Sequence, residues 1–251
     1  MNTTRTIRVL VTVLLLGGAA TASAQQTTTG TTTSTMPLGG KLFVGVNVGA
    51  QTRSSTVNND FSFPLYRETA TVATTASVDR GAIFDVSVGY RFMPMFGVAI
   101  GYTSFSSTGT AQGTGSIPSP TFFNRPAAVT ISGTDAKRTD RNIYLVFVGF
   151  MPITDKLEVS GFIGPSATRV KQELISEATV PLGTQTVVST LQNQSGTAKG
   201  INVGGDLAYQ ILNQVGAGVF IRYISGSADL TSAQDVKVGG FQIGVGARLR
   251  F

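Results

Sequence analysis

Three residue types are missing from this chain of 251 residues: it has no cysteine, no histidine and no tryptophan. Without cysteine the chain can have neither a disulfide framework nor a thiolate nucleophile. Without histidine it can have no imidazole base, no histidine-ligated zinc and no serine–histidine–aspartate triad. These absences exclude most of the common catalytic and metal chemistries.

Charge is also scarce. Charged residues make up 13% of the chain, against ~25% in an average protein. Low charge argues against disorder, which requires high charge and low hydrophobicity. The formal net charge of +6 is not gathered into a basic run, so we expect no nucleic-acid partner. Glycine, by contrast, is abundant, with 30 residues.

The first 24 residues have the pattern of a secretory signal peptide. Arg5 and Arg8 precede a short apolar stretch over residues 9–20, and small residues lead to Ala24. The apolar stretch is too short for a transmembrane helix, so an N-terminal anchor is the weaker alternative. We expect cleavage near Ala24, a flexible Thr/Gly-rich leader over residues 25–39, and one folded domain over residues 40–251.

The rest of the chain shows period-2 alternation of apolar residues, which is typical of β-strands with one apolar face. In residues 241–251 every odd position is apolar and no even position carries a bulky apolar side chain. Residues 143–150 are apolar on both faces, and we expect Tyr144, Val146, Val148 and Phe150 to point outward. The eight predicted strands cover residues 42–51, 82–92, 96–103, 143–150, 157–164, 201–211, 215–223 and 241–251.

The predicted connections alternate between short and long, which is the wiring of an even-stranded antiparallel up-and-down barrel. Short turns fall at residues 93–95, 151–156 and 212–214. Longer, polar loops are expected at about residues 53–79, 106–140, 170–200 and 225–236. Parts of these loops should continue the hairpins, with residues 170–180 pairing with residues 185–191.

The composition of the non-apolar face decides between a soluble and a membrane barrel. Glycine, serine, asparagine and charged residues cannot fill a dry core, whereas the interior of a transmembrane barrel is small and polar. A tilted strand the length of residues 241–251 spans ~25 Å, the height of the apolar band of such a barrel. Phenylalanine and tyrosine near the strand ends fit two interfacial girdles, formed by Phe92, Phe96, Phe150, Tyr209 and Phe251 at one end and by Phe84, Tyr102, Tyr144, Tyr223 and Phe241 at the other.

With these features the chain resembles the small eight-stranded outer-membrane β-barrels of the OmpA/OmpX type. The resemblance rests on the Phe-Met-Pro turns, on "FGVAIGY" and on the closing "FQIGVGARLRF". It implies location in the outer membrane of a Gram-negative-type bacterium, with lipid and lipopolysaccharide as neighbours and without the peptidoglycan-binding domain of full-length OmpA. It also implies that the barrel assembly machinery reads Phe251, Leu249 and Ala247. Small outer-membrane enzymes of this kind use a histidine, so we expect no enzyme activity, catalytic residue, metal or cofactor.

Five charged residues fall at inward positions of the predicted strands: Asp85, Glu158, Asp206, Arg222 and Arg248. Buried charges survive when they are paired and hydrogen-bonded. The sequence therefore favours a network of salt bridges that plugs the lumen, with a gate for small ions as the alternative. Two further arginines, Arg91 and Arg250, fall at the short-turn rim, where we expect them to be solvated.

A collar of cations lies at the predicted loop ends of the strands, where it would meet either lipopolysaccharide phosphates or only solvent. Its members are Arg53, Arg80, Lys137, Arg138, Arg141, Lys171, Lys199 and Lys237. Aromatic residues in the loops, over residues 61–66 and at Phe122 and Phe123, would either pack over the barrel mouth or form an adhesive surface.

The sequence thus predicts an integral outer-membrane barrel with a structural or surface-interaction role, presenting four extracellular loops. A narrow gated channel is the alternative from the transport class, and an exported soluble ligand-binding barrel is a third possibility. The ligand of the loops is not predicted.

Overall fold

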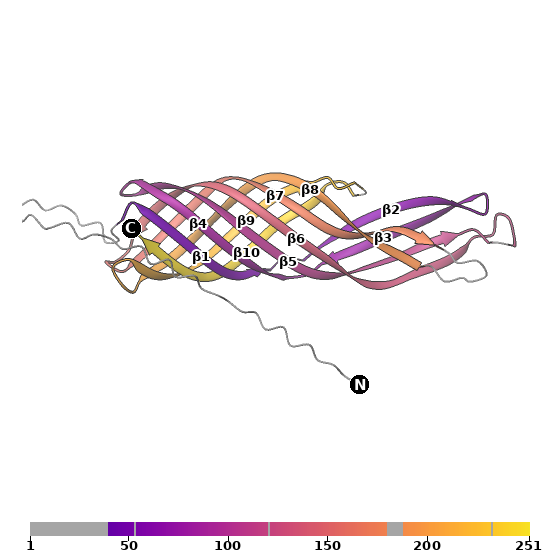
Figure 1. The fold of residues 1–251 in the computed structure, drawn as a ribbon, viewed down its shortest axis with the longest axis horizontal. Helices are drawn as coiled ribbons and strands as arrows, with labels where there is room; N and C mark the ends of the chain where they lie inside the picture. The colour runs from indigo at the N-terminus through magenta and orange to yellow at the C-terminus, as the bar shows by residue number, and fades with distance from the viewer. Residues whose placement is uncertain (1–39, 53, 120, 180–187, 232) are drawn as a thin grey trace, which may run out of the picture. The chain divides into compact units, whose positions relative to one another are not determined.

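A computed structural model describes residues 40–52, 54–119, 121–179, 188–231 and 233–251. The signal peptide and the leader expected over residues 1–39 lie outside the described residues. The described chain is built from antiparallel strands (Figure 1). It contains no helix of the length and apolar character needed to cross a membrane.

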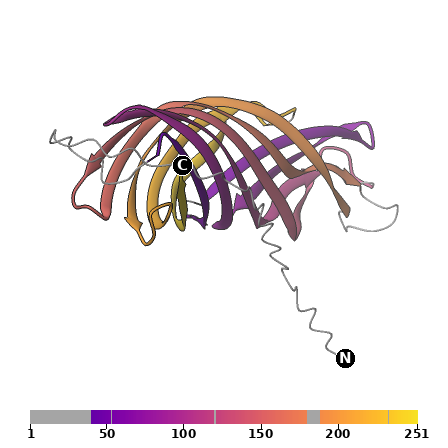
Figure 2. The same ribbon diagram turned by 60° about the vertical axis from the view of Figure 1, so that its left-hand side comes forward.

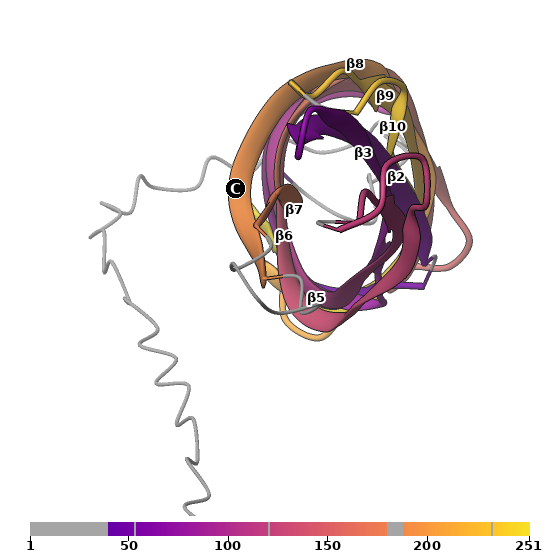
Figure 3. The same cartoon turned by 90° about the vertical axis from the view of Figure 1, so that its right-hand side faces the viewer.

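Eight of the ten strands form a closed antiparallel ring. Strand β1 pairs with both β4 and β10, and the additional pairing of β5 with β6 closes the circle, which Figure 3 shows end-on. The predicted eight-stranded barrel is therefore confirmed. In order around the ring the strands are β1 (Leu42–Gln51), β4 (Gly81–Met93), β5 (Phe96–Ile117), β6 (Ala127–Pro152), β7 (Leu157–Thr179), β8 (Val188–Gln210), β9 (Val215–Ala228) and β10 (Val236–Arg250).

Short turns join the strands at one end of the ring, which we call the short-turn end. They lie between β4 and β5, between β6 and β7, and between β8 and β9, where the sequence predicts them. The carboxyl-terminal residue Phe251 lies at the same end, hydrogen-bonded to Leu42 of β1. The opposite end carries long hairpins (Figures 1 and 2).

The first long connection folds into a hairpin instead of the expected polar loop. Strands β2 (Ser55–Leu65) and β3 (Glu68–Val78) pair with each other, and residues 71–76 of β3 also pair with the far end of β5. Two residues, Tyr66 and Arg67, form the turn, both with positive φ, as a type I′ hairpin requires. In Figure 1 this hairpin extends to the right, beyond the ring.

The second and third long connections are also shorter than predicted, because the ring strands continue past the apolar part of the barrel. Strand β5 has 22 residues and β6 has 26, and their pairing extends to Ile117 and Ala127. The predicted hairpin between β7 and β8 is present, with Ile175 opposite Leu191 and Thr179 opposite Val188. Its turn lies outside the described residues.

The outward face of the ring carries a belt of exposed large apolar side chains. Val88, Ile163, Ile221 and Val245 are 42–56% exposed. Apart from Phe162 and Phe220, their sequence neighbours on the inward face are small or polar, so the barrel is apolar outside and mostly small or polar inside at this level. This inversion excludes the soluble barrel, whose bulky apolar residues would fill the interior.

Strand β6 corrects one prediction. Tyr144, Val146, Val148 and Phe150 point inward and are 3–5% exposed, while Ile143, Leu145 and Phe147 face outward and are 46–57% exposed. Both faces of this segment are apolar, so alternation alone could not orient it. Consequently Tyr144 and Phe150 do not belong to the aromatic girdles, and Phe147 lies on the outer face instead, against Phe92 and Phe96.

The register with β5 explains the orientation of β6. The inward positions of β5 are small: Gly97 lies opposite Val148, Ala99 opposite Val146 and Gly101 opposite Tyr144. Large side chains on one strand thus fill the space that small residues leave on its neighbour. This complementarity gives close packing in a narrow interior.

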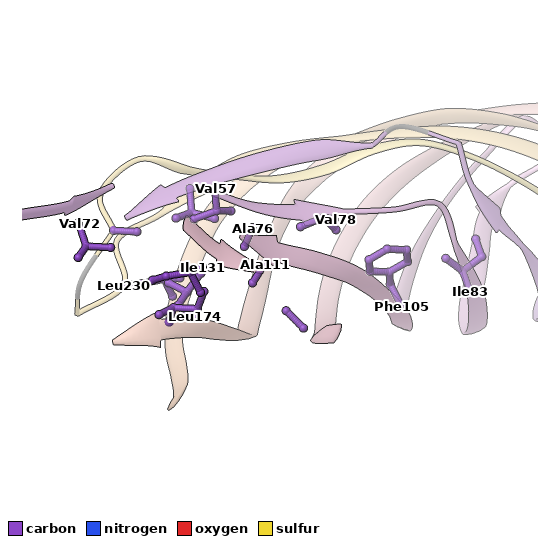
Figure 4. Packing of buried hydrophobic residues seen from close by; sticks show 14 of the residues in the cluster. Val57, Val72, Ala76, Val78, Ile83, Phe105, Ala111, Ile131, Leu174 and Leu230 are labelled. Carbon is purple, nitrogen blue, oxygen red and sulfur yellow. The ribbon is translucent and has the colours of Figure 1, made fainter. Parts of the chain in front are cut away.

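The largest apolar cluster lies inside the long-hairpin end, and we call it the apolar cap (Figure 4). It contains Phe105 of β5, Leu174 of β7 and Phe220 of β9, each no more than 5% exposed. Phe61 and Phe63 of the β2–β3 hairpin pack against it. The remaining members are Val57, Val72, Ala76, Val78, Ile83, Ala111, Ile131, Ala136, Ile175, Leu230, Ala233 and Val236.

Candidate functional site

The inward residues of the ring form a connected polar system, which we call the lumen network. At its centre the carboxylate of Asp85 accepts four hydrogen bonds from four other strands. Arg222 Nη1 donates at 2.9 Å, Asn47 Nδ2 at 2.8 Å, Thr103 Oγ1 at 2.8 Å and the Tyr144 hydroxyl at 2.9 Å. Asp85 and Arg222 are each 2% exposed. This carboxylate therefore joins β1, β4, β5, β6 and β9 across the barrel.

Arg222 extends the network toward the long-hairpin end. Its Nε donates to Gln242 Oε1 at 3.0 Å, and Gln242 Nε2 donates to Gln51 Oε1 at 3.0 Å. Its guanidinium carbon lies 5.2 Å from the ring centroids of both Tyr144 and Phe220. Arginine stacks on aromatic faces, which helps to compensate for its removal from water.

Glu158 is the second centre of the network and corrects another expectation. Arg91 Nη2 binds both of its carboxylate oxygens, at 2.9 and 3.0 Å, and Arg250 Nη2 binds Oε1. Arg91 is 5% exposed and Arg250 is 8% exposed, so neither rim arginine is solvated. Arg91 also lies over the ring of Phe150, 3.8 Å from its centroid. Both long side chains turn into the lumen, where Glu158 and an aromatic face are available.

A fourth ion pair of the network joins Arg248 to Asp206 through two hydrogen bonds. Arg248 Nη1 also donates to Asn47 Oδ1 at 2.6 Å, so Asn47 bridges this pair to Asp85. The structure thus places all five inward charges singled out from the sequence in ion pairs with one another or with the two rim arginines.

Further buried polar residues that the sequence reasoning missed line β6, β7 and β8. Thr168 Oγ1 donates to Asn142 Oδ1 at 2.9 Å. Gln172 and Asn202 are fully buried, at 0% exposure. Each continues the inward alternation of its strand, which is the signal that could have found them.

One cation of the predicted collar is inside the barrel. Arg138 is 3% exposed and binds both carboxylate oxygens of Asp140 at 2.8 and 3.0 Å, so it is not available to lipid. Its side chain continues the inward alternation of β6. Arg53 lies outside the described residues. The other members, Arg80, Lys137, Arg141, Lys171, Lys199 and Lys237, are exposed.

Arg141, a member of the collar, forms a like-charge pair with a residue outside the collar. Arg141 of β6 lies directly opposite Arg169 of β7, and both are exposed. Neither forms an ion pair among the described residues. Lys237, by contrast, is paired with Asp235 at 2.9 Å, and its hydrogen bonds hold the pKa of that carboxyl below its usual value.

The loop aromatics divide into two groups. Phe61 and Phe63 are stacked with ring centroids 6.2 Å apart and are half-buried against the apolar cap. Phe122 and Phe123 lie between β5 and β6 and are 60% and 73% exposed. The guanidinium carbon of Arg125 lies 5.9 Å from the centroid of the Phe122 ring. The first group therefore packs over the barrel mouth, whereas the second is free to contact other molecules.

The family model for the outer membrane protein beta-barrel domain matches residues 11–248, nearly the whole chain. The chain belongs to this family. The apolar belt therefore faces the lipid of the outer membrane of a Gram-negative bacterium. In barrels of this type the short turns are periplasmic and the long hairpins extracellular.

Solved structures of small barrels resemble the chain at low sequence identity. The first is Neisserial surface protein A (NspA), 13% identical, with a TM-score of 0.44 over 84% of this chain and 97% of that one. The second is OprG of Pseudomonas aeruginosa, 13% identical, with a TM-score of 0.41 over 84% and 97% of the two chains. The third is Ail of Yersinia pestis, 13% identical, with a TM-score of 0.39 over 83% and 99%. No curated protein sequence matches the chain.

Proposed function

We propose that this outer-membrane barrel has a structural and surface-interaction role, with a lumen closed to solutes and long hairpins presented to the exterior. The apolar cap is the observation that carries the proposal. Its members come from six ring strands, from the connection between β9 and β10 and from the β2–β3 hairpin, so the cluster spans the interior from wall to wall. An ion crossing this region would lose its hydration without gaining polar partners, at a cost of several kcal/mol.

The lumen network adds a second level of closure below the cap. Three charged residues of the network are each only 2% exposed: Asp85, Glu158 and Arg222. Asp85 pairs with Arg222, and Glu158 pairs with Arg91. Removing one partner of such a pair leaves an uncompensated buried charge. The network therefore resists rearrangement, which favours a plug over a gate.

The proposed membrane partner of the collar is the phosphate of lipopolysaccharide. Like charges directly opposite each other on neighbouring strands destabilise a sheet. The juxtaposition of Arg141 and Arg169 is relieved if an anionic group binds between them, and guanidinium groups bind phosphate in two-pronged hydrogen bonds. Ile143, the next outward residue of β6, is 57% exposed in the apolar belt, so the pair lies at the level of lipid headgroups.

The proposed contact surface for partners outside the cell is the tip between β5 and β6. Phe122 and Phe123 expose aromatic area beside Arg125, and aromatic residues and arginine are the residue types that dominate binding surfaces.

In biogenesis, the proposed partner is the barrel assembly machinery. It would read the outward residues Ala247 and Phe251, which are exposed, together with the half-buried Leu249.

Two experiments test the proposal. In vesicles with the refolded barrel, we expect arabinose to cause no swelling above that of empty vesicles, whereas swelling would contradict the closed lumen.

Cells that display the barrel should bind polystyrene beads, and Phe122→Ser with Phe123→Ser should reduce that binding several-fold. Thr121→Ala in the same loop is the matched control, and equal binding by all three proteins would contradict the surface role.

A further inference from the structure

The lumen network is not electrically balanced. At the level of the apolar belt the inward residues include three carboxylates, Asp85, Glu158 and Asp206. They face four arginines: Arg91, Arg222, Arg248 and Arg250. The imbalance arises because Glu158 serves two arginines at once. One positive charge among these buried groups is therefore left without a counter-charge, and an unmatched buried charge is costly.

A cavity of about 90 Å³ lies among these groups. Asp85, Asp206, Arg222, Arg248 and Arg250 all line it. About 10–15 Å³ of such volume is enough for one water molecule. The cavity therefore has room for a small ion with a few waters.

Two of the lining arginines keep an unused donor. Nη2 of Arg222 and Nη1 of Arg250 are buried and have no hydrogen-bond partner among the described residues. Both residues are more than nine-tenths buried, at 2% and 8% exposure. An unpaired buried donor, above all a charged one, is expensive unless something accepts its hydrogen bond. Both of these arginines line the cavity.

Aromatic side chains complete the lining of the cavity. Phe43, Phe150, Phe162 and Phe220 line the cavity together with the arginines. Phe43 and Phe150 meet edge to face, with centroids 5.3 Å apart and planes at 81°. The faces of Phe150 and Phe220 are already covered by the guanidinium groups of Arg91 and Arg222, so they are not open to a further cation.

A second, smaller hollow lies beside the cavity. Arg248 and Arg250 line both this cavity and a smaller hollow formed with residues 208–216 at the short-turn end. On the opposite side the apolar cap covers the lumen, and Phe220 belongs to both the cap and the cavity wall. The cavity, which we call the chamber, therefore lies next to the cap.

We propose that this chamber is a binding site for a small monovalent anion of the halide type, which neutralises the surplus arginine charge. The proposed site lies in the lumen, so it does not depend on what the extracellular hairpins contact. Chloride is the probe that fits the chamber, whereas gluconate carries the same charge and is too large to enter.

The test measures the unfolding temperature of the refolded full-length chain in detergent, in sodium chloride and in sodium gluconate at equal ionic strength. We expect chloride to raise the midpoint by about 2–4 °C in a saturable manner. Arg250→Gln balances the lumen charges while Arg91 still pairs with Glu158, so this variant should lose the difference between the salts. Arg80→Gln removes the same charge from an exposed site and should keep the difference.

Equal midpoints of the wild type in the two salts would overturn the proposal, as would a difference that persists in Arg250→Gln. If Arg250→Gln does not fold, Ser87→Asp places a carboxylate in the same chamber and should also abolish the chloride effect. In crystals soaked in bromide, the anomalous signal should lie in the chamber, beside one of its lining arginines. A crystal without that signal in the chamber would contradict the site directly.

Discussion

Gly101 of β5 and Tyr144 of β6 lie directly opposite each other, and a Cβ atom on Gly101 would lie 2.3 Å from Cζ of Tyr144. The absence of a side chain at Gly101 thus gives the tyrosine ring its place inside the barrel. From there its hydroxyl donates to Asp85 at 2.9 Å. One glycine therefore sets both the orientation of β6 and one of the hydrogen bonds of the lumen network.

Gly101→Ala should destabilise the barrel by about 1–3 kcal/mol, because the added methyl group displaces the Tyr144 ring from a packed interior. Urea unfolding in detergent, followed by circular dichroism, measures the change. Gly161→Ala is the matched control, since a Cβ there meets only the carbonyl oxygen of Gly204, at 4.0 Å. Equal stability of the two variants would show that the close approach has no energetic weight.

Asp85→Asn should lower the free energy of unfolding by about 3–5 kcal/mol, because it leaves Arg222 buried without its counter-charge. The double variant with Arg222→Met should recover part of the loss, since both charges are then absent. The same urea titration measures both variants. Asp235→Asn, which breaks the exposed pair with Lys237, should leave the unfolding curve unchanged. A curve for Asp85→Asn that matches the wild type would contradict the buried pair.

Lipopolysaccharide should raise the unfolding temperature of the reconstituted barrel relative to phospholipid alone, and Arg141→Gln with Arg169→Gln should remove most of that increase. The reason is that an anionic headgroup relieves the repulsion within the pair. Thermal scans in the two kinds of vesicle provide the measurement. Arg125→Gln changes an exposed arginine at the loop tip and should keep the full effect. An increase that survives in the double variant would place the lipid contact elsewhere.

Phe251→Ala should reduce the amount of barrel inserted into the outer membrane of living cells several-fold, while the purified variant refolds into detergent like the wild type. The reason is that Phe251 acts in recognition by the assembly machinery and adds little to packing, being 57% exposed. Phe241→Ala is the matched control, because Phe241 is 54% exposed on the outer face of the same strand. If both variants insert equally, the terminal residue is not the signal.

Much of the barrel could be predicted because the alternation of apolar and polar residues has a physical cause. Outward side chains of a strand face lipid, whereas inward side chains face the lumen. Seven strands were oriented correctly in this way. The eighth, β6, was not, since the residues from Ile143 to Phe150 are apolar on both faces. Only the small inward residues of β5, Gly97 and Gly101, point to large inward partners, and that signal requires the strand register.

The sequence predicts which charged residues lie at the centre of the lumen, but it does not predict the net charge of the lumen. Alternation places Asp85, Glu158 and Arg222 inside the barrel. It does not show that the flexible side chains of Arg91 and Arg250 reach Glu158 from the rim. Those two contacts turn an expected surplus of one carboxylate into a surplus of one arginine, so the properties of the lumen depend on side-chain reach.

The central claim is that the lumen of this outer-membrane barrel is closed, and planar-bilayer recording tests it most directly. The wild type should insert without conductance steps, and so should Arg222→Ala, because Phe105, Leu174 and the rest of the apolar cap remain in place. A known open porin in the same bilayer shows that insertion and detection succeed. Silent recordings from both proteins are the predicted result, and regular unitary steps from the wild type would contradict the account.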